Sequence, residues 1–482
     1  MGVRGRTTTL CLRSLKKGLR TRIMCSVKNQ PKITVGIMDR QTEIFGRLDG
    51  DFRGDGFGPV SGRFSAKATA GMIVLTDEAH REIVRSPSIR LTALKDSTRS
   101  AAPSHASKDG VEERGSGSTF TLFNVTIGNR FHWERTEDQT FQGDLIVRLR
   151  KDGTICAINE IPLEDYLTSV ISSEMNADAP MEFLKAHSIL SRSWLLAALD
   201  QEKETKRTSK PVTSITKEEV IHWCDREDHD LFDVCADDHC QRYQGITKIV
   251  SEQAKDAVQE TSGRVMTYQG EICDSRYSKC CGGLTEEFDT AWDDKRVPYL
   301  RSIPDTSVLH QATNTEEEAQ RWILSAPEAY CNTRDEDLLE KILSEIDRKT
   351  KTFFRWTVEY RREELEEILR EKSGFDFGTL QEIVPLRRGS SGRISKLKIV
   401  GSKRTMVVGK ELEIRRWLSR SHLQSSAFLV TFEAGRVVFH GAGWGHGVGL
   451  CQIGAAVMAT RGFSAETILK HYFRNIEIRK IY

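Results

Sequence analysis

The sequence contains no apolar run that approaches the roughly 18 residues a membrane-spanning helix needs. Its start also lacks the uninterrupted apolar core of a secretory signal peptide. The net charge is only +2 although 29% of the residues are charged, so no overall field favours nucleic acid as a partner. With 482 residues and ample apolar content, the chain is expected to fold into two or three packed units.

A dense disulfide framework is also absent, because the eleven cysteines are an odd number scattered over a long chain. The segment HDLFDVCADDHC, residues 229–240, instead gathers two thiols and two imidazoles. Sulfur together with imidazole favours zinc over calcium or magnesium, and four protein ligands leave no open coordination position. We therefore predict a structural Zn2+ bound by His229, Cys235, His239 and Cys240.

Two alternatives to this zinc site stay open. His222 and Cys224 are competing ligands a few residues upstream. The spacing also lacks a CxxC knuckle, so free cysteines and surface histidines near a turn would account for the same residues. A zinc hydrolase would differ from the predicted site in keeping one coordination position open.

A glycine-rich run, HGAGWGHGVGLCQIGAA, extends from His440 to Ala456 and matches neither GxGxxG nor GxxxxGK[ST]. Phosphate binding is therefore disfavoured. The glycines allow the backbone to approach a ligand or another segment closely, and Trp444 and His446 can project from it. The plain alternative is a glycine turn that satisfies a tight bend. Gln452 is expected to tether the helix that follows.

The basic residues cluster in a leader, residues 1–32, which carries nine lysines and arginines and no acidic residue. Threonines and serines are interspersed among them, a composition typical of an organelle transit peptide. A disordered basic arm or a mistaken start codon would give the same composition. If the leader is a transit peptide, the protein is expected in a plastid, whose reducing interior suits free thiols.

Residues 33–150 are predicted to be rich in β-structure, because short segments alternate between apolar and polar side chains. The predicted strands cover 33–38, 121–127, 144–150 and 154–161. Within this region, residues 96–118 are rich in serine, glycine and charge and predict an exposed, flexible loop.

From Leu163 the apolar spacing becomes helical, and a second helix is predicted from Pro180 to about Leu199. Charged surface helices are expected at 337–351 and 361–372, followed by strands at 394–400 and 427–432. The glycine-rich run then leads into a closing helix. The predicted fold class is α+β.

Glu174 ends the apolar face of the first helix, directly before the break at Asn176 to Pro180. Desolvation there could raise its pKa enough for proton donation near neutral pH, although an ordinary solvated glutamate is the alternative. Arg192, in the second helix, could face back toward the same break. In the segment RYSKCCGG, a strand that ends in a glycine turn could present Tyr277 and Lys279 to a cleft. The vicinal cysteines that follow are interpreted as buried small side chains.

Five motifs occur in one order: IPLEDYLTSVISSEM, KAHSILSRSW, FDVCADDHCQRYQG, YSKCCGGLTEEFDTAW with VPYLRSIPD, and GAGWGHGVGLCQIGA. Together they resemble the stage II sporulation protein D (SpoIID/LytB) family from about Ile33 to the C-terminus. The resemblance implies a mixed β-rich and helical fold with an active-site cleft between lobes. It divides the chain into the leader (1–32), an N-terminal β-rich region (33–150), a SpoIID core with the helix pair and zinc loop (151–310), and a C-terminal helical and β region (311–482).

The resemblance implies a lytic transglycosylase that cleaves peptidoglycan glycan strands, preferentially strands stripped of stem peptides. Glu174 matches the family's catalytic acid, Arg192 its important arginine, and Tyr277 with Lys279 its Tyr-x-Lys pair. Asn176 replaces the proline of the family's Glu-Met-Pro motif, so the loop after the acid is expected to take a different course. Family members with zinc use two histidines and two cysteines in the region of the predicted zinc site.

The resemblance also gives the glycine-rich run a place, as one wall of a glycan cleft. Trp444 would stack on a sugar face, and His446 would hydrogen-bond within the site or only hold the loop. The alternative function is a non-catalytic glycan-binding scaffold that activates another wall hydrolase, such as an amidase. A wall enzyme without a transit peptide would be expected in the cell envelope, in sporulation or in general wall remodelling.

Overall fold

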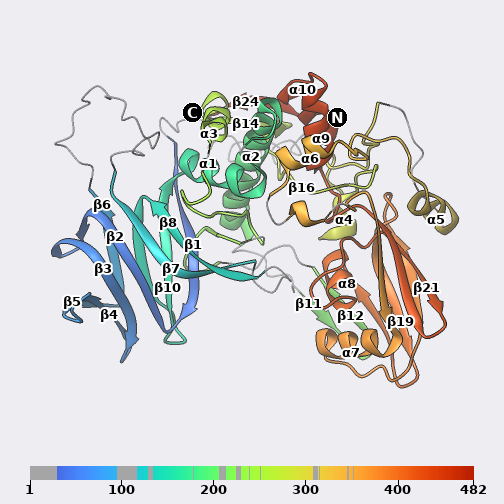
Figure 1. The fold of residues 1–482 in the computed structure, drawn as a ribbon, viewed down its shortest axis with the longest axis horizontal. Helices are drawn as coiled ribbons and strands as arrows, with labels where there is room; N and C mark the ends of the chain where they lie inside the picture. The colour runs from blue at the N-terminus through green and yellow to red at the C-terminus, as the bar shows by residue number, and fades with distance from the viewer. Residues whose placement is uncertain are drawn as a thin grey trace, which may run out of the picture.

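The computed structural model describes residues 30–94, 117–128, 134–176, 178–205, 213–223, 229–237, 239–249, 251–307, 313, 315–344, 347–350 and 352–482. The basic leader lies outside these residues except for its last three positions, and the predicted loop at 96–118 except for its last two. Cys224 also lies outside them. Figure 1 shows β-structure at both ends of the molecule and a group of helices between them.

The N-terminal part is an eleven-stranded sheet. Its main path runs β13-β1-β10-β9-β6-β2-β3-β4-β5, and β7 joins it by pairing with β2 and β8. Its strands are β1 (Lys32–Gln41), β2 (Glu43–Gly54), β3 (Phe57–Thr69), β4 (Met72–Asp77), β5 (Glu82–Ser86), β6 (Ser88–Ala93), β7 (Thr119–Ile127), β8 (Arg135–Gln142), β9 (Asp144–Leu149), β10 (Ile155–Pro162) and β13 (Val234–Cys235). The four strands predicted from alternation are confirmed as β1, β7, β9 and β10.

This sheet continues across the boundary that the sequence suggested at residue 150. Strands β9 and β10 lie on either side of that position and pair antiparallel, from Ile155 with Leu149 to Glu160 with Asp144. The short β13 returns from the cluster of thiols and imidazoles to pair parallel with β1. Strands from both sides of residue 150 are therefore hydrogen-bonded into one sheet.

The central part is helical and contains the predicted helix pair. The helices are α1 (Leu163–Glu174), α2 (Met181–Thr205), α3 (Glu252–Glu260), α4 (Phe288–Ala291), α6 (Glu336–Ile342), α9 (Gln452–Thr460) and α10 (Ala465–Tyr472). Short strands accompany them, with β14 (Arg264–Tyr268) between β15 (Glu271–Ile272) and β24 (Glu477–Lys480), and β16 (Tyr277–Ser278) beside β23 (Leu450–Cys451). Leu163, Tyr166, Leu167 and Val170 are fully buried, because the helical period places them on one face of α1.

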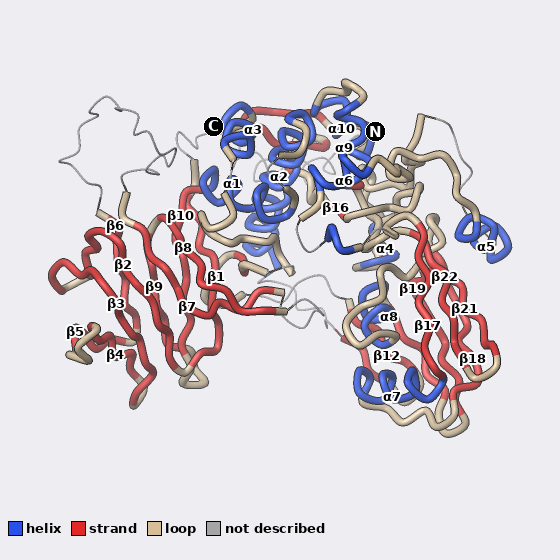
Figure 2. Tube along the Cα trace, viewed as in Figure 1, coloured by secondary structure: helices blue, strands red, loops and turns tan. Residues whose placement is uncertain are grey.

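The C-terminal part contains a five-stranded sheet, a three-stranded sheet and covering helices (Figure 2). The elements are β11 (Thr213–Ile215), β12 (Glu219–His222), β17 (Arg355–Arg361), β18 (Leu380–Arg388), β19 (Ile394–Gly401), β20 (Thr405–Gly409), β21 (Phe428–Glu433), β22 (Arg436–Ala442), α5 (Glu316–Leu324), α7 (Arg362–Ser373) and α8 (Glu411–Trp417). A separate apolar core, which includes Trp356, Leu397, Trp417 and Phe439, holds this part together.

The mixed α+β class is confirmed, as are the helix at 361–372 and the closing helix. One helix prediction was wrong in extent: α6 ends at Ile342, and the 3-10 turn η1 (Asp347–Lys349) follows instead of a continuous helix to 351. The charge pattern of that segment is helical, but Leu343 takes an extended conformation that ends the helix. In the part of the chain that the structure describes, no helix is long and apolar enough to span a membrane.

Candidate active site

Glu174 is the last residue of α1, and the chain turns into an extended conformation at Met175. Its Oε1 accepts a 2.8 Å hydrogen bond from the Tyr277 hydroxyl and a 3.0 Å bond from the backbone N–H of Arg242. Among the described residues, no donor is bonded to the other oxygen, Oε2. One oxygen of this partly exposed carboxyl is therefore fixed, and the other is available for a proton or a ligand.

The side chain of Lys279 lies beside the C-terminal end of α1. Its Nζ is 3.5 Å from the carbonyl oxygen of Glu174 and 3.4 Å from Sδ of Met175. The same ammonium forms a 2.8 Å ion pair with Asp347, and both side chains are about nine-tenths buried. Burial raises the pKa of Asp347, but the charges of Lys279 and Arg242 outweigh it and leave that pKa below its ordinary range.

Tyr277 reaches Glu174 from strand β16, which pairs parallel with β23 through Tyr277–Leu450 and Ser278–Cys451. Burial raises the pKa of Tyr277 well above its ordinary value, and the neighbouring charge of Glu174 raises it further. The phenol therefore stays protonated at neutral pH and acts as a hydrogen-bond donor to the carboxyl.

His187 lies behind Tyr277, with the two ring centroids 4.7 Å apart. Its Nε2 contacts Nε2 of Gln452 at 3.1 Å, and its Nδ1 contacts the Ser191 hydroxyl at 3.2 Å. Burial lowers the pKa of His187 to about 4, so the imidazole is neutral at physiological pH. Gln452, the first residue of α9, thus links that helix to α2 beneath the tyrosine.

The glycines of the glycine-rich run approach the protein's own chain. A Cβ atom at Gly447 would lie 2.4 Å from Cζ of Arg393, and one at Gly449 would lie 2.1 Å from the carbonyl oxygen of Arg276. Both glycines also have positive φ, which side chains rarely adopt. The sequence alone did not decide whether these glycines make room for a ligand or for another segment of the chain. At Gly447 and Gly449 they make room for other segments, which contain Arg393 and Arg276.

Trp444 and His446 both contact protein side chains and are partly exposed. The Trp444 ring lies 5.1 Å from Phe353, and its backbone pairs with Cys280. Nδ1 of His446 accepts a 3.0 Å hydrogen bond from the N–H of Val448, and its ring lies 4.6 Å from Trp292. These contacts make His446 a residue that holds the loop, and contact of either residue with a glycan stays a prediction.

Arg192 does not face the break after Glu174. Its guanidinium is fully buried and binds both carboxylate oxygens of Glu164, at 3.0 and 2.6 Å, near the start of α1. It also donates to the carbonyl of Arg264 at 3.0 Å. The expectation that it turns toward Glu174 is therefore corrected: the rotation of α2 directs it to the opposite end of α1.

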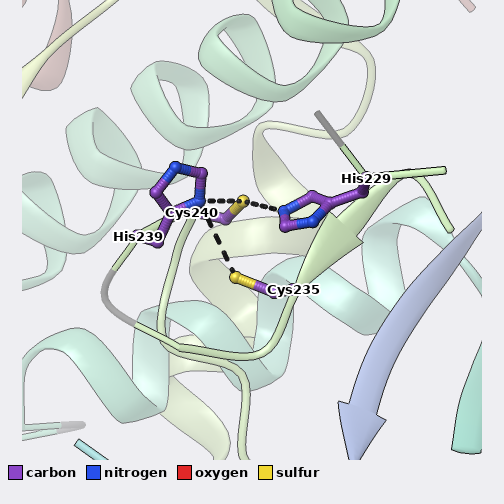
Figure 3. Close-up of side chains that lie close together, drawn as sticks. All are labelled: His229, Cys235, His239 and Cys240. Atoms are coloured by element: carbon purple, nitrogen blue, oxygen red, sulfur yellow. Dashed lines mark hydrogen bonds between the residues drawn. The ribbon is translucent and has the colours of Figure 1, made fainter. Parts of the chain in front are cut away.

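The four residues of the predicted zinc site lie together (Figure 3). Their ligand atoms all fall within 4.8 Å of one another. The Cys240 sulfur is 3.3 Å from Nε2 of His229 and 3.5 Å from Nδ1 of His239, and the Cys235 sulfur is 4.0 Å from the same Nδ1. A tetrahedral zinc would separate a bound sulfur and nitrogen by about 3.6 Å, so the donor set fits the ion in size and in chemistry.

Comparisons with known proteins match the part of the chain that holds these residues. A family model described as stage II sporulation protein matches residues 151–268, which contain Glu174 and the thiol–imidazole cluster. Stage II sporulation protein D of Bacillus amyloliquefaciens is 21% identical over 322 residues, 67% of this chain and 75% of that protein. Its counterpart in Bacillus subtilis (strain 168) is 22% identical over 324 residues, 67% of this chain and 76% of that protein. The matched segment is therefore a SpoIID domain.

The SpoIID domain is followed by residues 286–449, which match a domain of unknown function (DUF8618). The chain is also 25% identical to the amidase enhancer of Bacillus subtilis (strain 168) over 324 residues, 64% of this chain and 39% of that protein. The SpoIID domain and this similarity support a function related to the cell wall.

Sequence reasoning about the SpoIID core missed three contributors to the site. The backbone N–H of Arg242 has no side-chain signal, and Asp347 belongs to a charged segment that gives no sign of a buried ion pair. His187 does carry a signal, because it stands among apolar residues on the buried face of α2. That position is more often occupied by a core histidine than by a site residue.

Proposed function

We propose that this SpoIID-domain protein is a lytic transglycosylase that cleaves the bond between N-acetylmuramic acid and N-acetylglucosamine in peptidoglycan. The observation that carries the proposal is the carboxyl of Glu174 at a helix end, with one oxygen held by Tyr277 and the ammonium of Lys279 nearby. A single positioned carboxyl is what an acid-then-base reaction requires.

In the proposed reaction, the carboxylic acid of Glu174 donates its proton to the glycosidic oxygen, and the bond from that oxygen to the muramyl C1 breaks. The resulting carboxylate then withdraws the proton of the muramyl C6 hydroxyl. That oxygen attacks C1 and closes the 1,6-anhydro ring. Glu174 regains its proton, so the cycle is balanced without water and without a second carboxylate, unlike ordinary glycoside hydrolysis.

Two other carboxylates of this region support the one-acid scheme because both are already engaged. Glu164 is bound by Arg192 and by the hydroxyl of Tyr482, and Asp347 is paired with Lys279. Neither is free to activate water beside Glu174. Lys279 would orient the sugar and stabilise developing charge, while the Tyr277 hydroxyl, which donates its one proton to Glu174, would orient the acid.

Arg192 takes a positioning role in this scheme. The buried pair with Glu164 joins α1 to α2, and α1 carries Glu174 at its other end. Trp444 would stack on a sugar ring, while His446 and Gln452 hold the loop and the helix behind the site. The substrate would be glycan strands stripped of stem peptides, turned over in wall remodelling or sporulation.

A zinc ion held by His229, Cys235, His239 and Cys240 would supply structural support only, because four protein ligands complete a tetrahedron. Arg242 lies two residues after Cys240, and its N–H is one of the two donors to Glu174. The segment also packs on α1, where the Tyr243 ring lies 5.1 Å from Tyr166. Fixing this loop therefore fixes one side of the catalytic carboxyl.

Product analysis tests the activity. The full-length chain is incubated with glycan strands freed of stem peptides, and the products are separated and weighed by mass spectrometry. Muramyl ends with a 1,6-anhydro ring, one water lighter than hydrolysis products, are expected. Reducing muramyl ends would instead identify a hydrolase.

A second candidate follows from the similarity to an amidase enhancer, which favours a glycan-binding activator of another wall hydrolase. In that case the chain alone would release no product, but it would bind glycan and accelerate an added amidase. An activator would also keep its effect when Glu174 is changed to glutamine, whereas the proposed enzyme would not.

We propose that the cellular location depends on residues 1–32. The protein would act in a plastid if these residues are removed as a transit peptide, and in the cell envelope otherwise. Sequencing the N-terminus of the protein isolated from its source decides between the two. Cleavage close to residue 32 is expected for a transit peptide, and an intact basic leader would contradict it.

A further inference from the structure

A second group of possible metal ligands lies in the interior, apart from the cluster at residues 229–240. It consists of Cys281, Asp305, Cys331 and Cys451, whose ligand atoms all lie within 4.8 Å of one another. No more than 2% of any of these residues is exposed. The four come from separate segments of the chain, so only the folded structure brings them together.

The spacing of the sulfur atoms suits a single ion. The sulfurs of Cys281 and Cys331 are 3.6 Å apart. Two thiolates on one tetrahedral zinc would be separated by about 3.8 Å. A cluster with several irons would distribute its thiolates over different iron atoms and require a wider arrangement.

Asp305 distinguishes this group from a simple set of buried thiols. Its Oδ1 accepts a 2.6 Å bond from the Tyr472 hydroxyl, and its Oδ2 accepts a 2.8 Å bond from the N–H of Cys331. A Cβ atom at Gly454 would lie 2.4 Å from Oδ1, so the absence of a side chain at this glycine leaves room for the carboxylate. Among the described residues, no lysine or arginine forms an ion pair with it. A buried carboxylate without a cation is costly, and a divalent ion would neutralise it.

The surroundings also suit the negative charge of three thiolates. The guanidinium of Arg355 donates to the carbonyl of Gly282 at 3.0 Å, and that of Arg393 donates to the carbonyl of Cys281 at 3.2 Å. The N–H of Cys281 points to the sulfur of Cys451 at 3.2 Å. Bound thiolates commonly receive such outer hydrogen bonds and nearby positive charge.

We propose that Cys281, Asp305, Cys331 and Cys451 bind one zinc ion as a second, fully internal metal site. Three thiolates and one carboxylate complete a tetrahedron, so this ion is structural. It joins the segment after Lys279 to the strand before Gln452, because Cys451 pairs with Ser278 between β16 and β23. The inference concerns metal binding alone and holds whether or not the chain is an enzyme.

The test counts zinc in a chain from which the first cluster has been removed. The full-length double variant Cys235→Ser/Cys240→Ser is produced with zinc in the medium and examined by native mass spectrometry and elemental analysis. One zinc ion per folded chain is expected. Adding Cys331→Ser is expected to abolish it, while adding Cys273→Ser, a buried thiol outside both groups, is expected to leave it in place.

Three results would overturn the proposal. A folded double variant without zinc would remove the site. A peptide map of unreduced protein that shows a Cys281–Cys331 disulfide would replace the ion with a covalent link. Loss of the ion in Cys280→Ser would show that the assigned ligands are wrong, because Cys280 is a neighbour outside the proposed set. If the Cys331 variant does not fold, the zinc count in the double variant still decides.

Discussion

The hydroxyl of Tyr277 donates a 2.8 Å hydrogen bond to Oε1 of Glu174, although 103 positions separate the two residues in the chain. The phenol is held between that carboxyl and the ring of His187, and Gln452 supports the imidazole from behind. This connects the end of α1, the N-terminal third of α2, strand β16 and the start of α9. The proposed acid is thus oriented by elements from three separate parts of the sequence.

Changing Tyr277 to Phe removes this donor and keeps the ring. Because a hydrogen bond to a charged group contributes about 1.5–3 kcal/mol, the rate of glycan cleavage is expected to fall about tenfold to a hundredfold. The rate is measured on stripped glycan strands with the folded fraction checked by circular dichroism. The matched control is Tyr268→Phe, and equal rates for the two variants would contradict the role of Tyr277.

His187 makes the stability of the fold depend on pH. Its pKa is lowered by burial to about 4 in the folded protein, against about 6.5 in an unfolded chain. The unfolded state therefore binds more protons between these values, so the stabilisation is complete above pH 6.5 and is lost as the pH falls toward 4. The loss amounts to at most about 1.4 kcal/mol per pH unit.

The variant His187→Asn is expected to lack this slope. Urea denaturation of wild type and variant at several pH values from 7 to 4 measures it. His471, whose pKa burial also lowers to about 4, contributes a similar slope to both proteins and cancels in the comparison. Parallel stability curves for the two proteins would show that the neutral state of His187 is not maintained by the fold.

Arg192 is expected to matter for stability rather than for chemistry. Arg192→Lys keeps the charge but breaks the two-point contact with Glu164 in the interior, and loss of a hydrogen bond to a charged group costs about 1.5–3 kcal/mol. Activity per folded molecule should be largely retained. Denaturation and cleavage are measured on the same preparations, with the exposed Arg479→Lys as control. A stable but inactive variant would instead place Arg192 in the reaction.

The helix pair and the first thiol–imidazole cluster could be predicted from the sequence for clear physical reasons. Helical periodicity identifies α1 and α2, since each buries one apolar face. The ligands of the cluster occupy a dozen consecutive residues, so a local turn is enough to bring them together.

The remaining features could not be predicted, because they depend on how distant elements pack. The rotation of α2 about its own axis decides that Arg192 meets Glu164, and no local pattern encodes it. The pairing of β16 with β23 brings Tyr277 to Glu174. Likewise, 50 residues separate Cys281 from Cys331, so the two cysteines do not form a recognisable metal-binding motif in the sequence.

Loss of the first cluster is expected to disturb the proposed acid through Arg242. The variant Cys240→Ser should lose the zinc proposed for this cluster, melt at a lower temperature and cleave glycan more slowly, because the N–H that bonds Glu174 is no longer held. Metal content, thermal unfolding and cleavage rate are measured together, with Cys273→Ser as the control thiol. Full activity in a folded variant that has lost the ion would separate the cluster from the site.

The most direct measurement of the central claim compares wild type, Glu174→Gln and the control Asp165→Asn on stripped glycan strands. Asp165 is an exposed carboxylate on the same helix, so its change tests for nonspecific effects of lost charge. Wild type and Asp165→Asn are expected to yield 1,6-anhydro muramyl ends, and a folded Glu174→Gln is expected to yield none. Undiminished anhydro product from Glu174→Gln, or no anhydro product from the wild type, would contradict the account.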